Sequence, residues 1–246
     1  MTNDKKWIEH IRNKELECIK EIIQKTKKKH ILEIGGKNGY FAKILTNWGF
    51  EVISIDIDPI STYFDVKKMN ATNLEFESDT FDIILSSHVI AHIKDKELLF
   101  HEINRVLKTN GIIIHIVPSN WWSIITNFWH YILLPKYLFQ KNKKNKSTIT
   151  NKVKINNYKK NRLKNLLFYH PLGVEKSFLI EIIKFSKKNW KDLFVSFEYI
   201  INNQLNGPLV YSGYDIFKNK GNKLRKYFAV IFPCSYIFIM NKKLIF

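Results

Sequence analysis

The segment ILEIGGKNGYF, residues 31–41, carries the clearest chemical pattern in the chain. An apolar run containing Glu33 leads into three glycines, Gly35, Gly36 and Gly39. A buried strand followed by a glycine-rich turn lets the backbone approach a bound ligand closely. This turn is therefore a candidate cofactor site.

A second acid supports that interpretation. Asp56 ends the next β-branched run, 21 residues after Gly35, where a carboxylate can accept hydrogen bonds from both hydroxyls of a ribose. The glycines do not follow the GxGxxG order of a dinucleotide site, and a GK[ST] phosphate loop is missing from the sequence. The two features together indicate an adenosine-containing cofactor.

The elements that must position these residues follow an alternating pattern, typical of a parallel sheet built from βαβ units. We expect an opening amphipathic helix in residues 1–20, strands at 30–35, 50–56, 81–87 and 111–117, helices at 38–49, 95–108 and 174–189, and an antiparallel pair of edge strands at 192–201 and 234–246. The predicted fold is α/β, a doubly wound, mostly parallel seven-stranded Rossmann-like sheet with an aromatic and basic insertion after strand five. Its expected parts are 1–119, the insertion 120–170, and 171–246, which completes the same sheet.

Charge is unevenly distributed over the 246 residues, whose formal net charge is +18. Residues 103–174 hold thirteen Lys and Arg and no acid. This segment is either a solvated surface of a lysine-rich chain or a contact for an anionic partner. Since the sequence has two cysteines and no apolar secretion signal at its start, we expect a cytoplasmic protein without a metal site.

Residues 109–135 contain no charged side chain and three tryptophans. Polar residues and Pro118 interrupt this run, so a lid helix or an interfacial helix is favoured over a membrane span. The basic residues 141–164 that follow predict a loop or insertion.

The sequence resembles the class I S-adenosylmethionine-dependent methyltransferases. The resemblance rests on ILEIGGKNGYFAKIL, VISIDIDP, NATNLEFESDTFDIILSSHVIAHI and EINRVLKTNGIIIHIVPS, in the order and spacing of that family, over residues 28–119. The later segments look like a subgroup that methylates small molecules and surface polysaccharides, of the methyltransferase type 11 kind. The resemblance implies S-adenosylmethionine as the cofactor.

The resemblance also implies roles for individual residues. Glu33 would support the turn and reach the cofactor amino group through water, Asp56 would hold the ribose, and Asn70 with Ala71 would lie beside the adenine. The remaining implied cofactor contacts are Gly35, Gly36, Lys37, Gly39, Ile57 and Ser87. Lys37 departs from the family pattern, which has glycine there. Its side chain either points outward into water or pairs with the methionine carboxylate, and the outward position is favoured.

Methyl transfer needs a positioned acceptor and a group that removes its proton. His88 just past the fourth strand is the first candidate base, and His92 one helical turn later is the second; both are expected near the sulfonium. Packing or capping by these histidines is the alternative. The candidate contacts for the acceptor are Trp121, His130, Tyr131, His170 and Tyr211. The alternative interpretation is that these residues pack in the core.

Ser86-Ser87-His88-Val89 follows the fourth strand in place of the Asn/Asp-Pro-Pro-aromatic motif of amino-group methyltransferases. We therefore predict an oxygen acceptor, with a carbon acceptor favoured less. The expected reaction is O-methylation, at a hydroxyl or carboxyl group, of a small-molecule or lipid-linked carbohydrate, with peripheral contact to an anionic membrane. An RNA methyltransferase that uses the basic insertion is favoured less, as is a non-catalytic, cofactor-binding regulatory relative.

Overall fold

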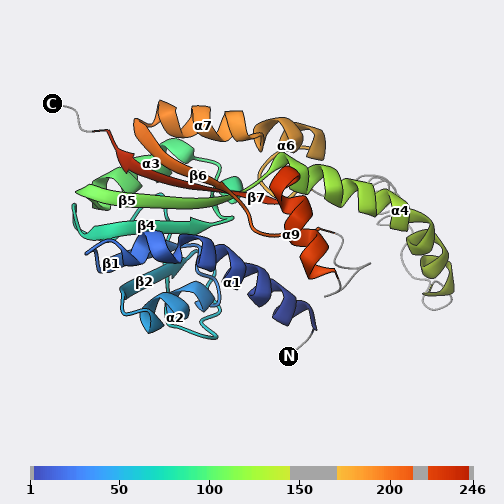
Figure 1. Cartoon of the computed structure of the whole chain (residues 1–246), viewed down its shortest axis with the longest axis horizontal. Coiled ribbons are helices and arrows are strands. Elements are labelled where there is room, and N and C mark those ends of the chain that lie inside the picture. Colours follow the sequence, from blue (N-terminus) through green and yellow to red (C-terminus); the bar gives the residue numbers. More distant parts are fainter. Residues whose placement is uncertain (1–2, 145–170, 213–220, 244–246) are drawn as a thin grey trace, which may run out of the picture.

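The structure, a computed structural model, describes residues 3–144, 171–212 and 221–243. It is a seven-stranded sheet with helices on both faces (Figure 1). The strands are β1 His30–Ile34, β2 Glu51–Asp56, β3 Val66–Lys68, β4 Phe81–Ser87, β5 Leu107–Pro118, β6 Tyr199–Asn206 and β7 Ser235–Lys242. The helices are α1 Asn3–Gln24, α2 Tyr40–Asn47, the 3-10 turn η1 Ile90–His92, α3 Lys96–Val106, α4 Asn120–Lys144, α6 Phe178–Lys184, α7 Lys187–Ser196 and α9 Asn222–Ile231.

The strand order is β3-β2-β1-β4-β5-β7-β6. The first five strands are parallel, and β7 is antiparallel to both of its neighbours, β5 and β6. The prediction of a seven-stranded, mostly parallel sheet with an antiparallel pair at one edge is confirmed. The order reverses between β1 and β4, so a ligand is expected outside the carboxyl ends of these two strands.

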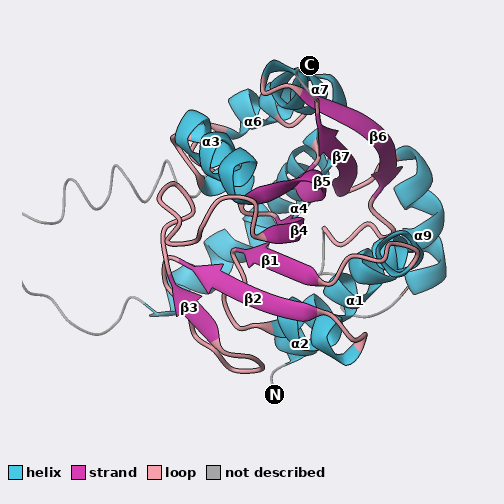
Figure 2. Cartoon of the chain, turned by 90° about the vertical axis from the view of Figure 1, so that its left-hand side faces the viewer, coloured by secondary structure: helices cyan, strands magenta, loops and turns pink. Residues whose placement is uncertain are grey.

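Two apolar clusters, one on each face of the sheet, hold these layers together. Leu16, Ile19 and Leu45 of α1 and α2 pack on one face, where they are almost fully buried. Phe100 of α3 and Phe194 of α7 pack on the other, and Figure 2 shows the two helical layers separated by the sheet. Burial of such side chains contributes roughly 1.5–3 kcal/mol each, which places most of the driving force for folding in these two layers.

The strand predicted at residues 192–201 is wrong in its first half. Ser186 accepts a hydrogen bond from the Asn189 N–H and caps α7, which runs to Ser196. Trp190 and Phe194 then face the sheet at helical spacing, and the strand is left with residues 199–206. The same cap divides the single helix predicted at 174–189 into α6 and the beginning of α7.

Asn110-Gly111 does not stop the helix predicted at 95–108. The helix α3 ends at Val106, and β5 begins at the next residue, Leu107. The register of β5 on β4 jumps from Phe81↔Leu107 to Ile83↔Ile112, so Asn110 and Gly111 lie in a bulge of the strand. A bulge absorbs the turn-forming residues without ending the strand.

The aromatic segment after β5 is the helix α4, which extends away from the sheet (Figure 1). Residues 145–170 of the predicted insertion lie outside the described residues, as does His170. Within the described part of the chain, the helices are too short or too polar to cross a membrane.

Candidate active site

The glycine turn closes between β1 and α2 as the sequence predicts. Gly35 and Gly39 have φ values of +82° and +73°, a left-handed conformation that glycine adopts without steric cost. The Gly35 and Gly36 N–H groups both donate to the Ile55 carbonyl of β2, at 2.8 and 3.0 Å. A Cβ on Gly36 would lie 1.9 Å from the Ser54 hydroxyl, so the turn has no room for a side chain there.

Glu33 supports this turn from inside the sheet. Its carboxyl group is 5% exposed, accepts a 2.7 Å hydrogen bond from the Ser54 hydroxyl and is also hydrogen-bonded by the Ala42 backbone N–H of α2. Burial raises the pKa of Glu33 to about 7, against these two hydrogen bonds. Glu33 therefore exchanges its proton near neutral pH.

Asp56 organises the loop at the end of β2. Its two carboxylate oxygens accept hydrogen bonds from the Lys37 N–H at 3.0 Å and from the Asp58 N–H at 2.8 Å. Each oxygen keeps a second lone pair for a ligand. The Lys37 ammonium lies 2.7 Å from the Asp58 carboxylate and is 46% exposed, so its head is directed to this loop at the molecular surface. This pairing with Asp58 is neither of the two predicted positions, in water or on the methionine carboxylate, and contact between Lys37 and the cofactor stays a prediction.

Two cavities flank Gly35. A cavity of about 340 Å³ is lined by Asp56, Ile57, Asn70, Ala71 and His92, among others. Ile57 is 68% exposed and lies next to the acid Asp56. In this arrangement the apolar side chain can pack against the base of a nucleoside while the carboxylate binds its ribose. A second cavity of about 200 Å³ is lined by Arg12, Glu33, Gly36, Lys37 and Ser87.

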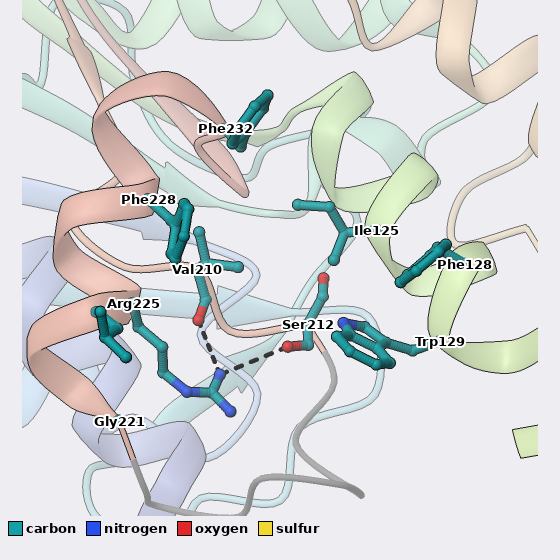
Figure 3. A pocket seen from close by; sticks show the side chains of 10 residues that line it. Ile125, Phe128, Trp129, Val210, Ser212, Gly221, Arg225, Phe228 and Phe232 are labelled. Carbon is teal, nitrogen blue, oxygen red and sulfur yellow. Dashed lines mark hydrogen bonds between the residues drawn. The ribbon is translucent and has the colours of Figure 1, made fainter. Parts of the chain in front are cut away.

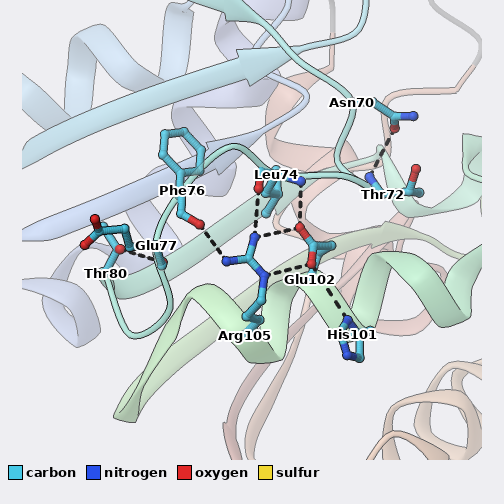
Figure 4. A network of polar contacts seen from close by, with 9 residues as sticks. All are labelled: Asn70, Thr72, Leu74, Phe76, Glu77, Thr80, His101, Glu102 and Arg105. Carbon is cyan, nitrogen blue, oxygen red and sulfur yellow. Dashed lines mark hydrogen bonds and ion pairs between the residues drawn. The ribbon is translucent and has the colours of Figure 1, made fainter.

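The loop that carries Asn70 and Ala71 is fixed from below by α3 (Figure 4). Arg105 donates to the Phe76 carbonyl at 2.6 Å and the Leu74 carbonyl at 2.8 Å, and it pairs with Glu102 at 2.8 Å. Hydrogen bonding to Arg105 is the main cause that lowers the pKa of Glu102 to about 2. Asn70 itself accepts a hydrogen bond from the Thr72 N–H at 3.1 Å, which shapes the turn.

His88 lies at the end of β4 in a left-handed conformation, with φ +58°. A residue other than glycine is strained in this conformation, and such strain is concentrated at functional sites. The His88 Nε2 is 3.0 Å from Glu15 Oε1, and the ring contacts Tyr211 edge to face at 6.2 Å. His92, in contrast, lines the larger cavity with Asp56, whereas His88 lines neither of the two cavities beside Gly35.

Glu15 is a fully buried carboxylate whose two oxygens are both hydrogen-bonded. Oε1 accepts from Ser235 at 3.0 Å as well as contacting His88, and Oε2 accepts from Arg12 at 2.8 Å. Burial opposes ionisation, but the interactions of the carboxylate with His88 and Arg12, which include a hydrogen bond from each, outweigh it and lower the pKa of Glu15 to about 2. The same burial lowers the pKa of His88 below its ordinary value, more than Glu15 raises it. At neutral pH the pair is an anionic carboxylate beside a neutral imidazole.

Arg12 and Glu15 were not among the predicted site residues. Arg12 donates to Ser87 at 2.8 Å as well as to Glu15, and it lines the smaller cavity. One signal was available: Glu15 falls midway between Ile11 and Ile19 at helical spacing, on the buried face of α1. An acid in an apolar stripe must have a buried partner.

Of the predicted acceptor contacts, Tyr211 lies edge to face against the His88 ring. The Trp121 ring lies edge to face against Phe232, with ring centroids 4.7 Å apart. Further along α4, the His130 and Tyr131 rings are also edge to face, with centroids 5.6 Å apart. Neither cavity beside Gly35 is lined by Trp121, His130 or Tyr131. Their predicted contact with an acceptor stays a prediction.

Comparison with known proteins agrees with this geometry. Residues 8–157, more than half of the chain, match a family model described as a methyltransferase domain. The chain belongs to this methyltransferase family. S-Adenosylmethionine is accordingly its cofactor, and the acid-flanked glycine turn between two cavities fits that molecule.

Relatives of this methyltransferase align over about a third of its length. An uncharacterized methyltransferase of Mycobacterium sp. is 28% identical over 92 residues, 34% of this chain and 36% of the relative. The ubiquinone/menaquinone biosynthesis C-methyltransferase UbiE of Xanthomonas campestris is 31% identical over 77 residues, 30% of each chain. The chain thus spans about a third of the length of these curated relatives.

Solved structures match the whole fold. A SAM dependent methyltransferase from Archaeoglobus fulgidus has a TM-score of 0.54 at 15% identity, over 92% of each chain. One from Methanosarcina mazei has a TM-score of 0.51 at 18% identity, over 91% of this chain and 98% of the other. At these identities the likeness shows the fold alone.

Proposed function

We propose that this methyltransferase methylates a hydroxyl group of a small-molecule or lipid-linked carbohydrate, with His88 as the general base. The observation that carries this proposal is the buried Glu15–His88 pair at the carboxyl end of β4, beside the cofactor cleft. A hydroxyl acceptor loses a proton during methylation, and a neutral imidazole is suited to take it near pH 7.

The cofactor contacts follow from the two cavities. Asp56 holds the ribose hydroxyls, and Ile57, Asn70 and Ala71 form the adenine end of the larger cavity. Arg12 takes the methionine carboxylate, because its guanidinium lines the smaller cavity, where it donates to Ser87 at 2.8 Å, and guanidinium groups bind carboxylates well. When bound, S-adenosylmethionine supplies a methyl group already activated on a sulfonium.

Glu15 sets the tautomer of His88. An ionised carboxylate can only accept a hydrogen bond, so the His88 Nε2 facing Glu15 carries the hydrogen. Nδ1 of the neutral ring then keeps its lone pair and can accept the acceptor's proton. The imidazolium that forms is stabilised by Glu15, while Arg12 keeps the carboxylate ionised throughout.

Carbon methylation is the second candidate, and the similarity to a C-methyltransferase favours it. A base at His88 serves an activated carbon acid as well as a hydroxyl. Oxygen remains the first candidate acceptor because the match to that relative covers 30% of this chain.

Peripheral contact with an anionic membrane is part of the proposal. Helix α9 has no acid, and its exposed Lys223 and Lys226 lie beside the exposed apolar Val230 and Ile231. Apolar side chains flanked by lysines are typical of a helix that lies on a lipid surface.

Methyl transfer from radiolabelled S-adenosylmethionine to a panel of nucleotide sugars and short-chain polyprenyl-phosphate sugars tests the function. His88→Asn should lower kcat by roughly a hundredfold or more without weakening cofactor binding, because general-base catalysis is typically worth that much. His101→Asn is the matched control, since that ring is 75% exposed on α3. Glu15→Gln should change the pH profile of kcat. Turnover by His88→Asn within twofold of the natural chain would refute the assignment of the base.

A further inference from the structure

A third cavity, of about 480 Å³, lies between α4 and α9, outside the cofactor cleft (Figure 3). Its walls are almost entirely apolar and come mainly from two helices about a hundred residues apart in sequence, together with the segment around Tyr211. The apolar side chains that line it include Ile125, Phe128, Trp129, Leu224, Phe228 and Phe232. Its volume is in the range of sites that bind small molecules, which are mostly apolar with few polar groups.

The fold places this cavity at the edge of the sheet where chemistry occurs. Helix α4 begins at Asn120, directly after β5, and Pro118 pairs with Ser235, the first residue of β7 after α9. Both helices therefore meet at the carboxyl ends of the parallel strands, where His88 follows the last residue of β4.

A single residue separates the cavity from His88. Val210 and Ser212 line the cavity, while the ring of Tyr211 between them contacts the His88 ring. Arg225 fixes this segment from α9, because it donates to the Val210 carbonyl at 2.8 Å and is 7% exposed. The Tyr211 ring therefore lies between this cavity and the proposed base.

The mouth of the cavity is apolar, with basic residues nearby. Phe128, Leu224 and Phe228 line the cavity and are nevertheless 56%, 63% and 48% exposed. Large exposed apolar groups that surround a hollow mark a binding surface. The exposed Lys223 and Lys226 are on the same helix, and neither α4 nor α9 contains an acid. The charge of this surface complements an anionic head group.

We infer that the cavity between α4 and α9 binds the apolar chain of a phosphate-bearing amphiphile. The phosphate is placed at the mouth of the cavity, on the side of Lys223 and Lys226. This inference goes beyond the proposed function and does not depend on it.

Calorimetric titration with dodecyl phosphate, below its micelle concentration, tests the inference. Butyl phosphate and dodecyl maltoside are the comparison ligands. Each buried methylene increases the affinity roughly fourfold. If dodecyl phosphate buries about four methylenes more than butyl phosphate does, its affinity should be over a hundredfold higher. Dodecyl phosphate should also bind more tightly than the uncharged maltoside.

The variant Phe228→Glu places a carboxylate on the cavity wall, and Tyr227→Glu is its matched control. Tyr227 is the adjacent residue on α9, 69% exposed, and does not line the cavity. Phe228→Glu should weaken dodecyl phosphate binding at least tenfold, and Tyr227→Glu should leave it within threefold. Binding of S-adenosylmethionine should be unchanged in both variants.

Two results would overturn the inference: no binding of dodecyl phosphate, or equal losses in the two variants. Equal binding of the maltoside would overturn the assignment of a phosphate head. The measurements also separate this inference from the proposed function. Binding of S-adenosylmethionine without binding of dodecyl phosphate would contradict only this inference. Binding of dodecyl phosphate without binding of S-adenosylmethionine would contradict the proposed function.

Discussion

Replacing Glu33 by Gln should make the free energy of unfolding less dependent on pH. The Glu33 carboxyl is buried under the glycine turn, and burial raises its pKa from 4.5 to about 7. In the folded protein Glu33 therefore holds a proton that the unfolded chain releases above pH 4.5. Stability attributable to this residue must fall as pH rises from 4.5 to 7, with the full penalty present above pH 7.

The size of this effect follows from the shift in pKa. At about 1.4 kcal/mol per unit, the rise from 4.5 to about 7 corresponds to about 3 kcal/mol. Gln resembles the protonated acid and its carbonyl oxygen can still accept from the Ser54 hydroxyl. Between pH 4 and pH 8 the stability of Glu33→Gln relative to the natural chain should therefore increase by about 3 kcal/mol.

Urea unfolding at half-unit pH steps, followed by tryptophan fluorescence, measures this difference directly. Comparing the two proteins at each pH cancels the titration of all other groups. Glu77→Gln, a substitution of an exposed acid, is the control and should give a flat difference. If the difference for Glu33→Gln is also flat, or has the opposite slope, Glu33 is not a buried acid of raised pKa and the account of the turn is wrong.

Three further predictions concern the turn, the adenine loop and the membrane surface. Gly36→Ala should destabilise the fold by about 1–3 kcal/mol in urea unfolding, since its Cβ would lie 1.9 Å from the Ser54 hydroxyl; an unchanged midpoint would contradict the packing described. Arg105→Lys should lower the melting temperature and weaken cofactor binding several-fold, because one ammonium cannot reach both loop carbonyls, and titration calorimetry would show whether binding is instead intact. The double variant Lys223→Ser/Lys226→Ser should bind phosphatidylglycerol vesicles roughly thirtyfold more weakly than the natural chain in a flotation assay, because each lysine contributes about 1 kcal/mol. Equal flotation of the two proteins would contradict the proposed membrane contact.

The cofactor half of the fold could be predicted because its signals are local. The β-branched runs, the positive-φ glycines and Asp56 lie within short segments whose order alone places them at one edge of a parallel sheet. The helix α7 could not be predicted in the same way. Residues 192–197 form a short apolar run that suits a strand or a buried helix equally, and the Ser186 cap with the packing of Trp190 decides between them.

The acceptor side could not be predicted because its contacts join distant parts of the chain. Glu15 and His88 are 73 residues apart, and no periodicity connects an acid on the first helix to the end of the fourth strand. The cavity between α4 and α9 depends likewise on how Phe128 and Phe228 are brought together by the sheet. Sequence patterns indicated an aromatic segment after β5, but which of its residues face a cavity is a tertiary property.

The most direct test of the account is calorimetric titration of the full chain with S-adenosylmethionine, beside Asp56→Ala and Asp65→Ala. Asp56 lines the larger cavity, whereas Asp65 is an exposed acid before β3. We predict micromolar binding to the natural chain and to Asp65→Ala, and a loss of at least tenfold for Asp56→Ala with its melting temperature showing that it still folds. Absence of binding to the natural chain, or equal binding to all three proteins, would contradict the cofactor cleft described above.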